Sequence, residues 1–302
     1  MKKLYGITVA MTTPFTEAGD VDLEAMAAHA EFLIRKGVHC LYPCGTTGEM
    51  LHLTTQERMD IAACVVKQAN GRVPVYIHVG APDLEDTVRM AKHAQQSGAD
   101  GIGVVTPIGA SEAQLEAYFK EVARSTSLPM YLYNIPQNAK SDISPALAQR
   151  LSENCQNIIG IKYSFMDLKR TWEYLSIHDG DFEVMHGSDR FVAPLMFIGC
   201  KGTISGNAGV YPEPYIELHE AAIAGDTQRV QHLMRLCTAV SKVLRGGKNV
   251  AYFKNALRYR GLSGGHMRVP QLDLTEEEAL KQFQQLDALC GKWGLKRSGL
   301  ED

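Results

Sequence analysis

Short apolar segments recur along the chain, separated by longer segments whose apolar residues repeat at helical spacing. The short segments are continuous apolar runs and lack the polar alternation of a strand with one face in water. They therefore predict buried β-strands, over Ile7–Met11, His39–Pro43, Val75–Val79, Gly101–Thr106, Met130–Asn134, Ile158–Lys162, Phe182–His186 and Gly202–Ser205.

The longer segments predict amphipathic helices. In Asp22–Arg35 the apolar residues fall three and four positions apart. Thr54 and Glu57 match a capping box, and Ser144-Pro145 places a proline at a first helical position. The same pattern covers Thr54–Ala69, Asp83–Ser97, Ser111–Ser125, Ser144–Glu153 and Arg190–Ile198. From about Pro212 onward only helical spacing remains, over Ala221–Ala224, Thr227–Leu244, Asn249–Tyr259 and Thr275–Trp293.

Eight strand–helix units predict an α/β fold, a (β/α)₈ TIM barrel, because such units build parallel sheets covered by helices. We expect the barrel over residues 1–225 and a C-terminal helical extension over residues 226–302. A doubly wound open sheet is the alternative. No Gly-x-Gly-x-x-Gly motif follows the first strand, which argues against a dinucleotide-binding version of that fold.

Composition narrows the class of protein further. Hydrophobic residues make up 45% of the 302 residues, charged residues 22%, and the formal net charge is -3. Scattered Lys and Arg argue against a nucleic-acid partner, and no apolar run is long enough to suggest a membrane segment. The seven cysteines are odd in number and lack Cys-x-x-Cys spacing, so we expect reduced thiols and a cytoplasmic protein.

Polar residues gather where the predicted strands end, which is where barrel enzymes carry their chemistry. Lys162 ends the apolar run Ile158–Ile161, so its stem should enter the barrel mouth. Such surroundings favour the neutral amine, which can attack a ketone and form a Schiff base. The alternative is a lysine that reaches solvent or pairs with a carboxylate.

Two further motifs accompany this lysine. In Gly45-Thr46-Thr47-Gly48-Glu49, glycines and hydroxyls could converge on a small anion such as a carboxylate, although a capped turn has the same composition. Tyr133, at the end of the fifth predicted strand, could relay protons, although a packed aromatic is the simpler interpretation.

In combination, these motifs resemble the dihydrodipicolinate synthase / N-acetylneuraminate lyase superfamily of class I pyruvate-dependent aldolases. The resemblance spans nearly the whole chain, including Gly6–Phe15, Gly45–Glu49, Tyr133–Pro136, Gly160–Lys162, Gly187–Asp189 and Gly199–Asn207. It implies a lyase that needs no cofactor beyond the covalent imine.

The resemblance also implies a role for individual residues. Lys162 corresponds to the Schiff-base lysine, Tyr133 to the proton-relay tyrosine, and Thr46 to its relay partner. Thr47 and nearby amides would hold the pyruvyl carboxylate, and the backbone carbonyl of Ile204 would border the site. Glu49 would be structural, bonding the amides of its own loop.

The sequence departs from the pattern in the half of the site that receives the second substrate. Ile108 stands where lysine-pathway synthases carry a tyrosine, and Asn138 replaces their carboxylate-binding arginine. Lys140 could compensate, although a solvated loop lysine is the simpler interpretation. Sialic acid lyases have an Asp-Glu pair where this chain has Asp189 and Arg190. Asn138 and Asp189 suit hydroxyl groups better than a second carboxylate.

The preferred hypothesis is therefore a lyase or aldolase for a 2-keto-3-deoxy sugar acid, with pyruvate and an aldehyde as partners. A 4-hydroxy-tetrahydrodipicolinate synthase or a keto-acid dehydratase are alternatives from the same superfamily. A metal-dependent class II aldolase using His78 and His186 lacks supporting spacing, so we expect no metal. A non-catalytic keto-acid-binding protein would have no use for Lys162. The resemblance also implies a homo-oligomer, a tetramer.

Overall fold

The computed structural model describes residues 2–300, and within them the eight predicted strands all form. Their bounds are β1 Gly6–Ala10, β2 Cys40–Tyr42, β3 Tyr76–His78, β4 Gly101–Val105, β5 Met130–Asn134, β6 Ile158–Tyr163, β7 Glu183–His186 and β8 Gly202–Ser205. Each agrees with its predicted segment to within a residue or two, because a continuous apolar run can only be buried on both faces of a sheet.

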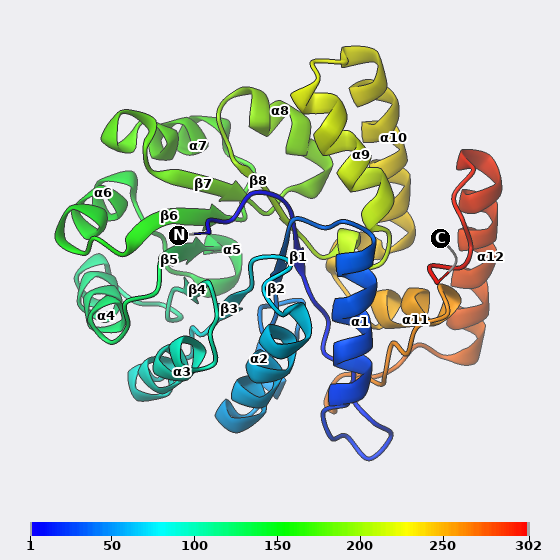
Figure 1. The fold of residues 1–302 in the computed structure, drawn as a ribbon, viewed down its shortest axis with the longest axis horizontal. Coiled ribbons are helices and arrows are strands. Elements are labelled where there is room, and N and C mark those ends of the chain that lie inside the picture. The colour runs from blue at the N-terminus through cyan, green and yellow to red at the C-terminus, as the bar shows by residue number, and fades with distance from the viewer. Residues whose placement is uncertain (1, 301–302) are drawn as a thin grey trace.

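The strands are parallel and follow the order β2-β1-β8-β7-β6-β5-β4-β3. A parallel bridge between Leu41 and Val75 joins the two ends, and the Leu41 amide donates to Pro74 O at 3.0 Å. The sheet is therefore a closed barrel, which confirms the predicted (β/α)₈ fold and excludes the open doubly wound sheet. Helices surround the strands in Figure 1.

The helices are α1 Leu23–Arg35, α2 Thr55–Ala69, α3 Leu84–Gln96, α4 Glu112–Arg124, α5 Pro136–Ala139, α6 Pro145–Asn154, α7 Leu168–Leu175, α8 Val192–Phe197, α9 Pro212–Ile223, α10 Thr227–Val243, α11 Ala251–Tyr259 and α12 Glu276–Trp293. The expected capping box of Thr54 and Glu57 begins α2. The short helices α5 and α7 were not predicted, and α9 begins nine residues before the predicted Ala221. The predicted helix from Arg190 starts instead as a 3₁₀ turn over Asp189–Phe191.

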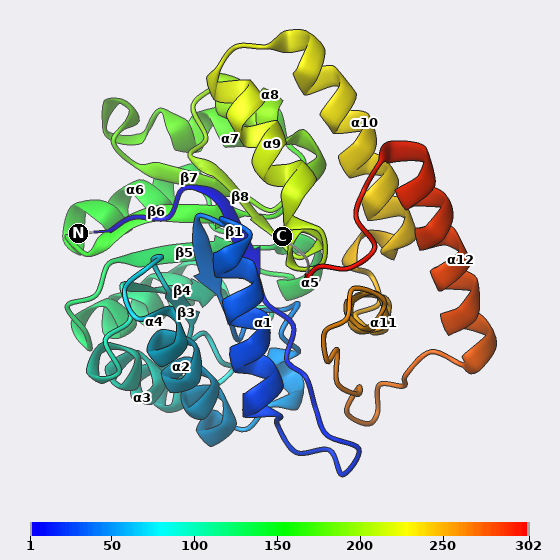
Figure 2. The ribbon, with the colours of Figure 1, turned by 45° about the vertical axis from the view of Figure 1, so that its right-hand side comes forward.

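Helices α10, α11 and α12 lie together beside α9 and α1, outside the ring of barrel helices (Figures 1 and 2). Arg260, directly after α11, is buried and pairs with Glu213 of α9 at 2.5 Å. Arg268 pairs with Glu57 of α2 at 2.6 Å, so the same region is also tied to the barrel wall. We propose that the barrel ends at residue 225, between α9 and α10, and that the helical extension begins there.

Alternate residues of each strand face the surrounding helices or the barrel interior. On β5, Leu132 packs in the outer core between sheet and helices, whereas Tyr131 packs inside the barrel with Tyr42 and Tyr76. Glycine provides the necessary space, because a Cβ at Gly103 would lie 1.9 Å from the Tyr42 hydroxyl oxygen. Large side chains thus fill the barrel interior and form the floor beneath its mouth.

None of the helices within residues 2–300 combines the length and the apolar character that a membrane crossing requires.

Candidate active site

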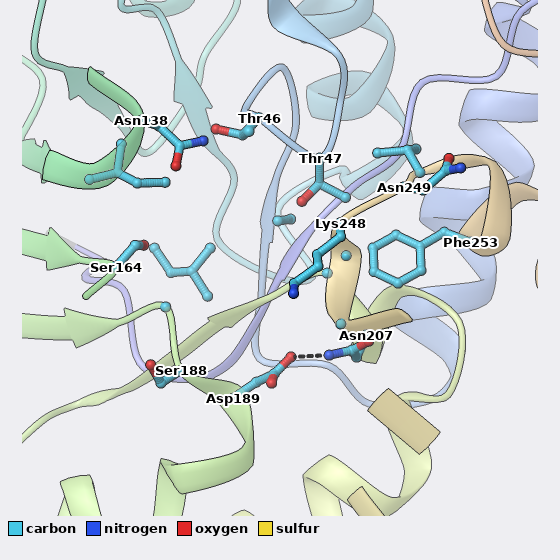
Figure 3. A pocket seen from close by; sticks show the side chains of 18 of the residues that line it. Thr46, Thr47, Asn138, Ser164, Ser188, Asp189, Asn207, Lys248, Asn249 and Phe253 are labelled. Atoms are coloured by element: carbon cyan, nitrogen blue, oxygen red, sulfur yellow. Dashed lines mark hydrogen bonds between the residues drawn. The ribbon is translucent and has the colours of Figure 1, made fainter. Parts of the chain in front are cut away.

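A cavity of about 880 Å³ opens at the carboxyl ends of the strands (Figure 3). Its wall includes every residue that the sequence singled out as catalytic or substrate-binding: Thr46, Thr47, Tyr133, Asn138, Lys162, Asp189 and Ile204. The loops after β2, β5, β6, β7 and β8 contribute to it, as barrel topology requires. The segment between α10 and α11 covers one side.

Lys162 lies near the end of β6 and is only 5% exposed. Strand register places it beside Tyr133 of β5, and its Nζ lies 4.0 Å from the centre of the Tyr133 ring and 4.9 Å from that of Tyr42. Within residues 2–300 it forms no ion pair. The lysine therefore neither reaches into solvent nor binds a carboxylate, and its amine is available to a ligand in the cavity.

The Tyr133 hydroxyl lies 3.4 Å from Thr46 Oγ1. This contact links the end of β5 to the loop that follows β2. Burial alone would raise the pKa of Tyr133, but the positive charge of Lys162 and hydrogen bonds from Thr46 and Ser164 outweigh it. The net effect lowers this pKa below its ordinary value. Tyr133 is therefore a better proton donor than a free tyrosine, at a position next to the amine.

The Gly45–Glu49 segment turns sharply and is held from below. Thr13 Oγ1 donates to Gly48 O at 2.8 Å, and a Cβ at Gly48 would lie 3.0 Å from Met11 O. Within the described chain the amides of Thr46 and Thr47 donate to no protein acceptor. Two amides and the Thr47 hydroxyl on a tight loop can hold a carboxylate.

The far half of the cavity is polar. Asn138 lies on α5, exposed to the cavity, whereas Asp189 is buried and accepts from Ser205 Oγ at 2.6 Å and Asn207 Nδ2 at 2.8 Å. Burial raises the pKa of Asp189, although these hydrogen bonds oppose the shift. Lys140 ends α5 in a left-handed conformation outside the cavity wall, so it does not replace the missing arginine.

The sequence predicts that Glu49 bonds the amides of its own loop, and this prediction is wrong. Its carboxylate lies 2.6 Å from Lys254 Nζ, and both side chains are almost fully buried. Glu49 itself is left-handed (φ 59°), which turns its side chain toward α11. The pair therefore holds the helical extension against the mouth of the barrel.

Sequence reasoning missed residues beside Lys162 and in the cavity wall. Tyr42 does not line the cavity, but its ring lies inside the barrel 4.9 Å from Lys162 Nζ, where strand alternation could have placed it. Lys248 and Phe253 come from the helical extension, and no strand-end argument points to them. Their contribution depends on how the extension packs.

One ring nitrogen of each histidine of the metal alternative is already hydrogen-bonded. His78 Nδ1 lies 3.1 Å from both Arg58 Nη2 and Cys44 O, and burial together with Arg58 lowers the pKa of His78 well below its ordinary value. His186 Nδ1 accepts from the Ser188 amide at 3.0 Å. No set of three or more His, Cys, Asp or Glu side chains in residues 2–300 is arranged to hold a metal ion.

Comparisons with known proteins agree with this geometry. The model of the dihydrodipicolinate synthetase family matches residues 3–289. A 4-hydroxy-tetrahydrodipicolinate synthase of Bacillus subtilis is 31% identical over 276 residues, which cover 91% of this chain and 95% of the relative. Another, from Halalkalibacterium halodurans, is 35% identical over 274 residues, covering 90% and 92%.

Solved structures add to this agreement. A prophage protein of E. coli K12 from the dihydrodipicolinic acid synthase family, solved with pyruvate, is 31% identical with a TM-score of 0.89, and the match covers 95% of this chain and 99% of that one. A sialic acid aldolase of Ruminococcus gnavus, 24% identical with a TM-score of 0.90 over 97% and 100% of the two chains, shares the fold. The chain therefore belongs to the dihydrodipicolinate synthetase family and is an enzyme of its class I lyase and aldolase type, as the sequence predicts.

Proposed function

We propose that the protein forms an imine between Lys162 and the keto carbon of its substrate, and cleaves or forms a bond at the methyl carbon of pyruvate. A 2-keto-3-deoxy sugar acid or a related keto acid is the proposed substrate. The observation that carries this proposal is the buried, unpaired amine 4.0 Å from the Tyr133 ring, at the mouth of the barrel. Two further findings support it: the chain belongs to a family of class I lyases and aldolases, and a relative has been solved in complex with pyruvate.

The proposed chemistry begins with attack of the neutral amine on C2. Tyr133 donates a proton to the resulting alkoxide, takes one from the nitrogen that the attack has left positively charged, and passes it to the departing hydroxyl, so that water leaves and a protonated imine remains. Thr46 returns protons to Tyr133 along their hydrogen bond. Thr47 and the free amides of its loop bind the carboxylate at C1.

Cleavage then needs an electron sink, which the imine supplies. Tyr133, left as the phenolate once water has departed, takes the proton of the C4 hydroxyl. The C3–C4 bonding electrons then move into the imine, which releases an aldehyde and leaves an enamine. Tyr133 returns the proton to C3, and hydrolysis releases pyruvate and the free lysine. Because the imine provides the electrophile, we propose that the enzyme needs neither a metal nor another cofactor.

Synthesis of 4-hydroxy-tetrahydrodipicolinate is the second candidate, since the relatives from Bacillus subtilis and Halalkalibacterium halodurans carry that name. Asn138 and Ile108 disfavour it, because they replace residues that the resemblance assigns to the aldehyde's carboxylate and to the proton relay. A dehydratase that uses the same imine is a further alternative.

A screen for pyruvate release from 2-keto-3-deoxy acids tests the proposed substrate class, with pyruvate plus aspartate semialdehyde run alongside. Release from a sugar acid supports the proposal. Consumption of pyruvate only with aspartate semialdehyde would establish the second candidate instead.

We also propose a homotetramer, as the resemblance implies. Large apolar side chains remain exposed on the described surface, including Trp172 of α7 (58%) and Leu280 of α12 (63%). Light scattering tests the assembly, and a monomer at working concentration would contradict it.

A further inference from the structure

The cavity is larger than a three-carbon keto acid needs. Its volume of about 880 Å³ lies near the upper end of the range of roughly 300–1,000 Å³ for small-molecule sites. The proposed pyruvyl subsite lies between Lys162 and the Thr47 loop, so most of the space extends away from it. The charges around that remaining space determine which substrates it favours.

The carboxylates in the cavity wall already have partners. Glu49 is paired with Lys254 at 2.6 Å. Asp189 accepts from Ser205 and Asn207, and its burial raises its pKa. Both carboxylates are thus held by buried partners, and the charge of Arg190, next in the chain, only adds to the hydrogen bonds that oppose the rise in the pKa of Asp189.

Two cations in the same wall have no such partner. Arg190 follows β7 and Lys248 follows α10, both are exposed, and neither forms an ion pair within residues 2–300. Two positive side chains from separate elements thus border one cavity, and neither is held in an ion pair by a carboxylate of residues 2–300. An anion bound between them would remove their uncompensated charge.

The backbone explains how Lys248 comes to face the cavity. After α10, Arg245, Gly246 and Gly247 all adopt left-handed conformations, with φ of 55°, 60° and 74°. This turn reverses the chain before α11, and Phe253 packs beside it, with its ring 3.4 Å from a Cβ built on Gly247. In Figure 3 the Lys248 side chain extends from the turn into the pocket, with its amino end directed away from Thr47 and toward Asp189.

We propose that Arg190 and Lys248 bind an anionic group at the end of the substrate remote from its keto carbon. This inference rests on the proposed function and makes its substrate class more specific: a 2-keto-3-deoxy acid that carries a second carboxylate or a phosphate. Arginine offers a bidentate fork and lysine a mobile point charge, which together suit either anion. Asn138 remains available to hydroxyl groups along the middle of the substrate.

This arrangement also accounts for two of the three departures of the sequence, those at Asn138 and Arg190. Asn138 occupies the place of a carboxylate-binding arginine, and Arg190 occupies the place of a sugar-binding glutamate. Compared with the lysine-pathway synthases, the positive charge therefore lies on a different side of the cavity. It is absent after β5 and present at the 3₁₀ turn Asp189–Phe191 and at the turn between α10 and α11.

Competition for Lys162 tests the proposal without requiring turnover. Labelled pyruvate is trapped on the enzyme with borohydride, and each competitor is scored by the concentration that halves trapping. One pair, 2-ketoadipate and 2-ketohexanoate, differs by a terminal carboxylate. The other pair, 2-keto-3-deoxy-6-phosphogluconate and 2-keto-3-deoxygluconate, differs by a phosphate.

In at least one pair, we expect the member with the second anionic group to compete about 10- to 100-fold better, the effect of one or two charge-assisted contacts. Lys248→Met and Arg190→Met should each remove most of that preference and leave the members that carry only the C1 carboxylate unchanged. Lys248→Arg should retain it. Lys140→Met, which removes a lysine outside the cavity wall, is the matched control and should change nothing.

The possible failures are distinguishable. If pyruvate is trapped at Lys162 but the two members of each pair compete equally, the anion subsite is wrong and the proposed function survives. The same holds if Lys248→Met weakens both members equally. If pyruvate is not trapped at Lys162 at all, the proposed function itself fails.

Discussion

Replacing Tyr133 with phenylalanine removes one hydroxyl group and should leave the fold intact. The ring, which lies 4.0 Å from Lys162 Nζ and 5.9 Å from the His78 ring, keeps its packing. The hydroxyl lies 3.4 Å from Thr46 Oγ1, which is long for a bond between two hydroxyl groups. We therefore expect the free energy of unfolding to fall by less than about 1 kcal/mol.

The catalytic effect should be much larger. If Tyr133 relays protons during imine formation and bond cleavage, kcat should fall by about 10²–10⁴-fold, or about 2.7–5.4 kcal/mol in the activation barrier. KM for the keto acid should change little, because the hydroxyl acts mainly in the transition state. Steady-state pyruvate release measures both constants.

The pH profile offers a second readout. Tyr133 must be protonated to donate, and the positive charge of Lys162 lowers its pKa despite burial. Activity should therefore be present below that pKa and decline above it, beginning below the ordinary tyrosine value of about 10. Tyr133→Phe should lack this alkaline decline in its residual rate.

Tyr131→Phe is the matched control. Tyr131 lies on the same strand and also faces the barrel interior, but its hydroxyl donates to Glu183 at 2.8 Å, away from the cavity wall. Its loss should lower stability by about 1–3 kcal/mol and leave kcat unchanged. If Tyr133→Phe keeps near-full kcat, or if both variants lose kcat equally, the proton relay does not run through Tyr133.

Three further outcomes follow from the structure. Thr47→Val should raise KM for the keto acid about tenfold with a smaller change in kcat, as steady-state kinetics will show; an unchanged KM would place the carboxylate elsewhere. Exhaustive EDTA treatment should leave kcat unchanged, whereas recovery of lost activity by added zinc or magnesium would favour a metal-dependent aldolase. Burial lowers the pKa of His29 from 6.5 to about 4 despite its bond to Gly209 O, so protonation favours the unfolded state and stability should fall as pH drops from 6.5 toward 4. In denaturant titrations His29→Gln should reduce this loss by up to about 3 kcal/mol, and an unchanged pH dependence would contradict the assignment.

The strands could be predicted from sequence because burial on both faces demands uninterrupted apolar runs. Helices were harder where other constraints applied. The α7 helix spans only Leu168–Leu175 and leaves Leu168 and Trp172 largely exposed, so its periodicity is short and its apolar face is incomplete. At the start of α9, Pro212 and Pro214 occupy the first turn, where proline is tolerated but obscures the helical pattern.

The same distinction applies to the site. Lys162 and Tyr133 could be placed together for two reasons. The ends of the strands converge at the barrel mouth, and residues paired across neighbouring parallel strands point to the same side of the sheet. Lys248 and the Glu49–Lys254 pair could not be foreseen, because they depend on how the helical extension packs over the barrel mouth. Local sequence patterns carry no information about that tertiary arrangement.

The identity of the reactive lysine is the most direct test of the account. Borohydride reduction in the presence of pyruvate, followed by peptide mass spectrometry, should show one reduced pyruvyl adduct on Lys162 and loss of activity. Lys162→Met should show no adduct, while Lys140→Met, which removes an exposed lysine outside the cavity wall, controls for selectivity by leaving Lys162 available for labelling. Labelling of wild-type enzyme at a different lysine, or no labelling at all, would contradict the central claim.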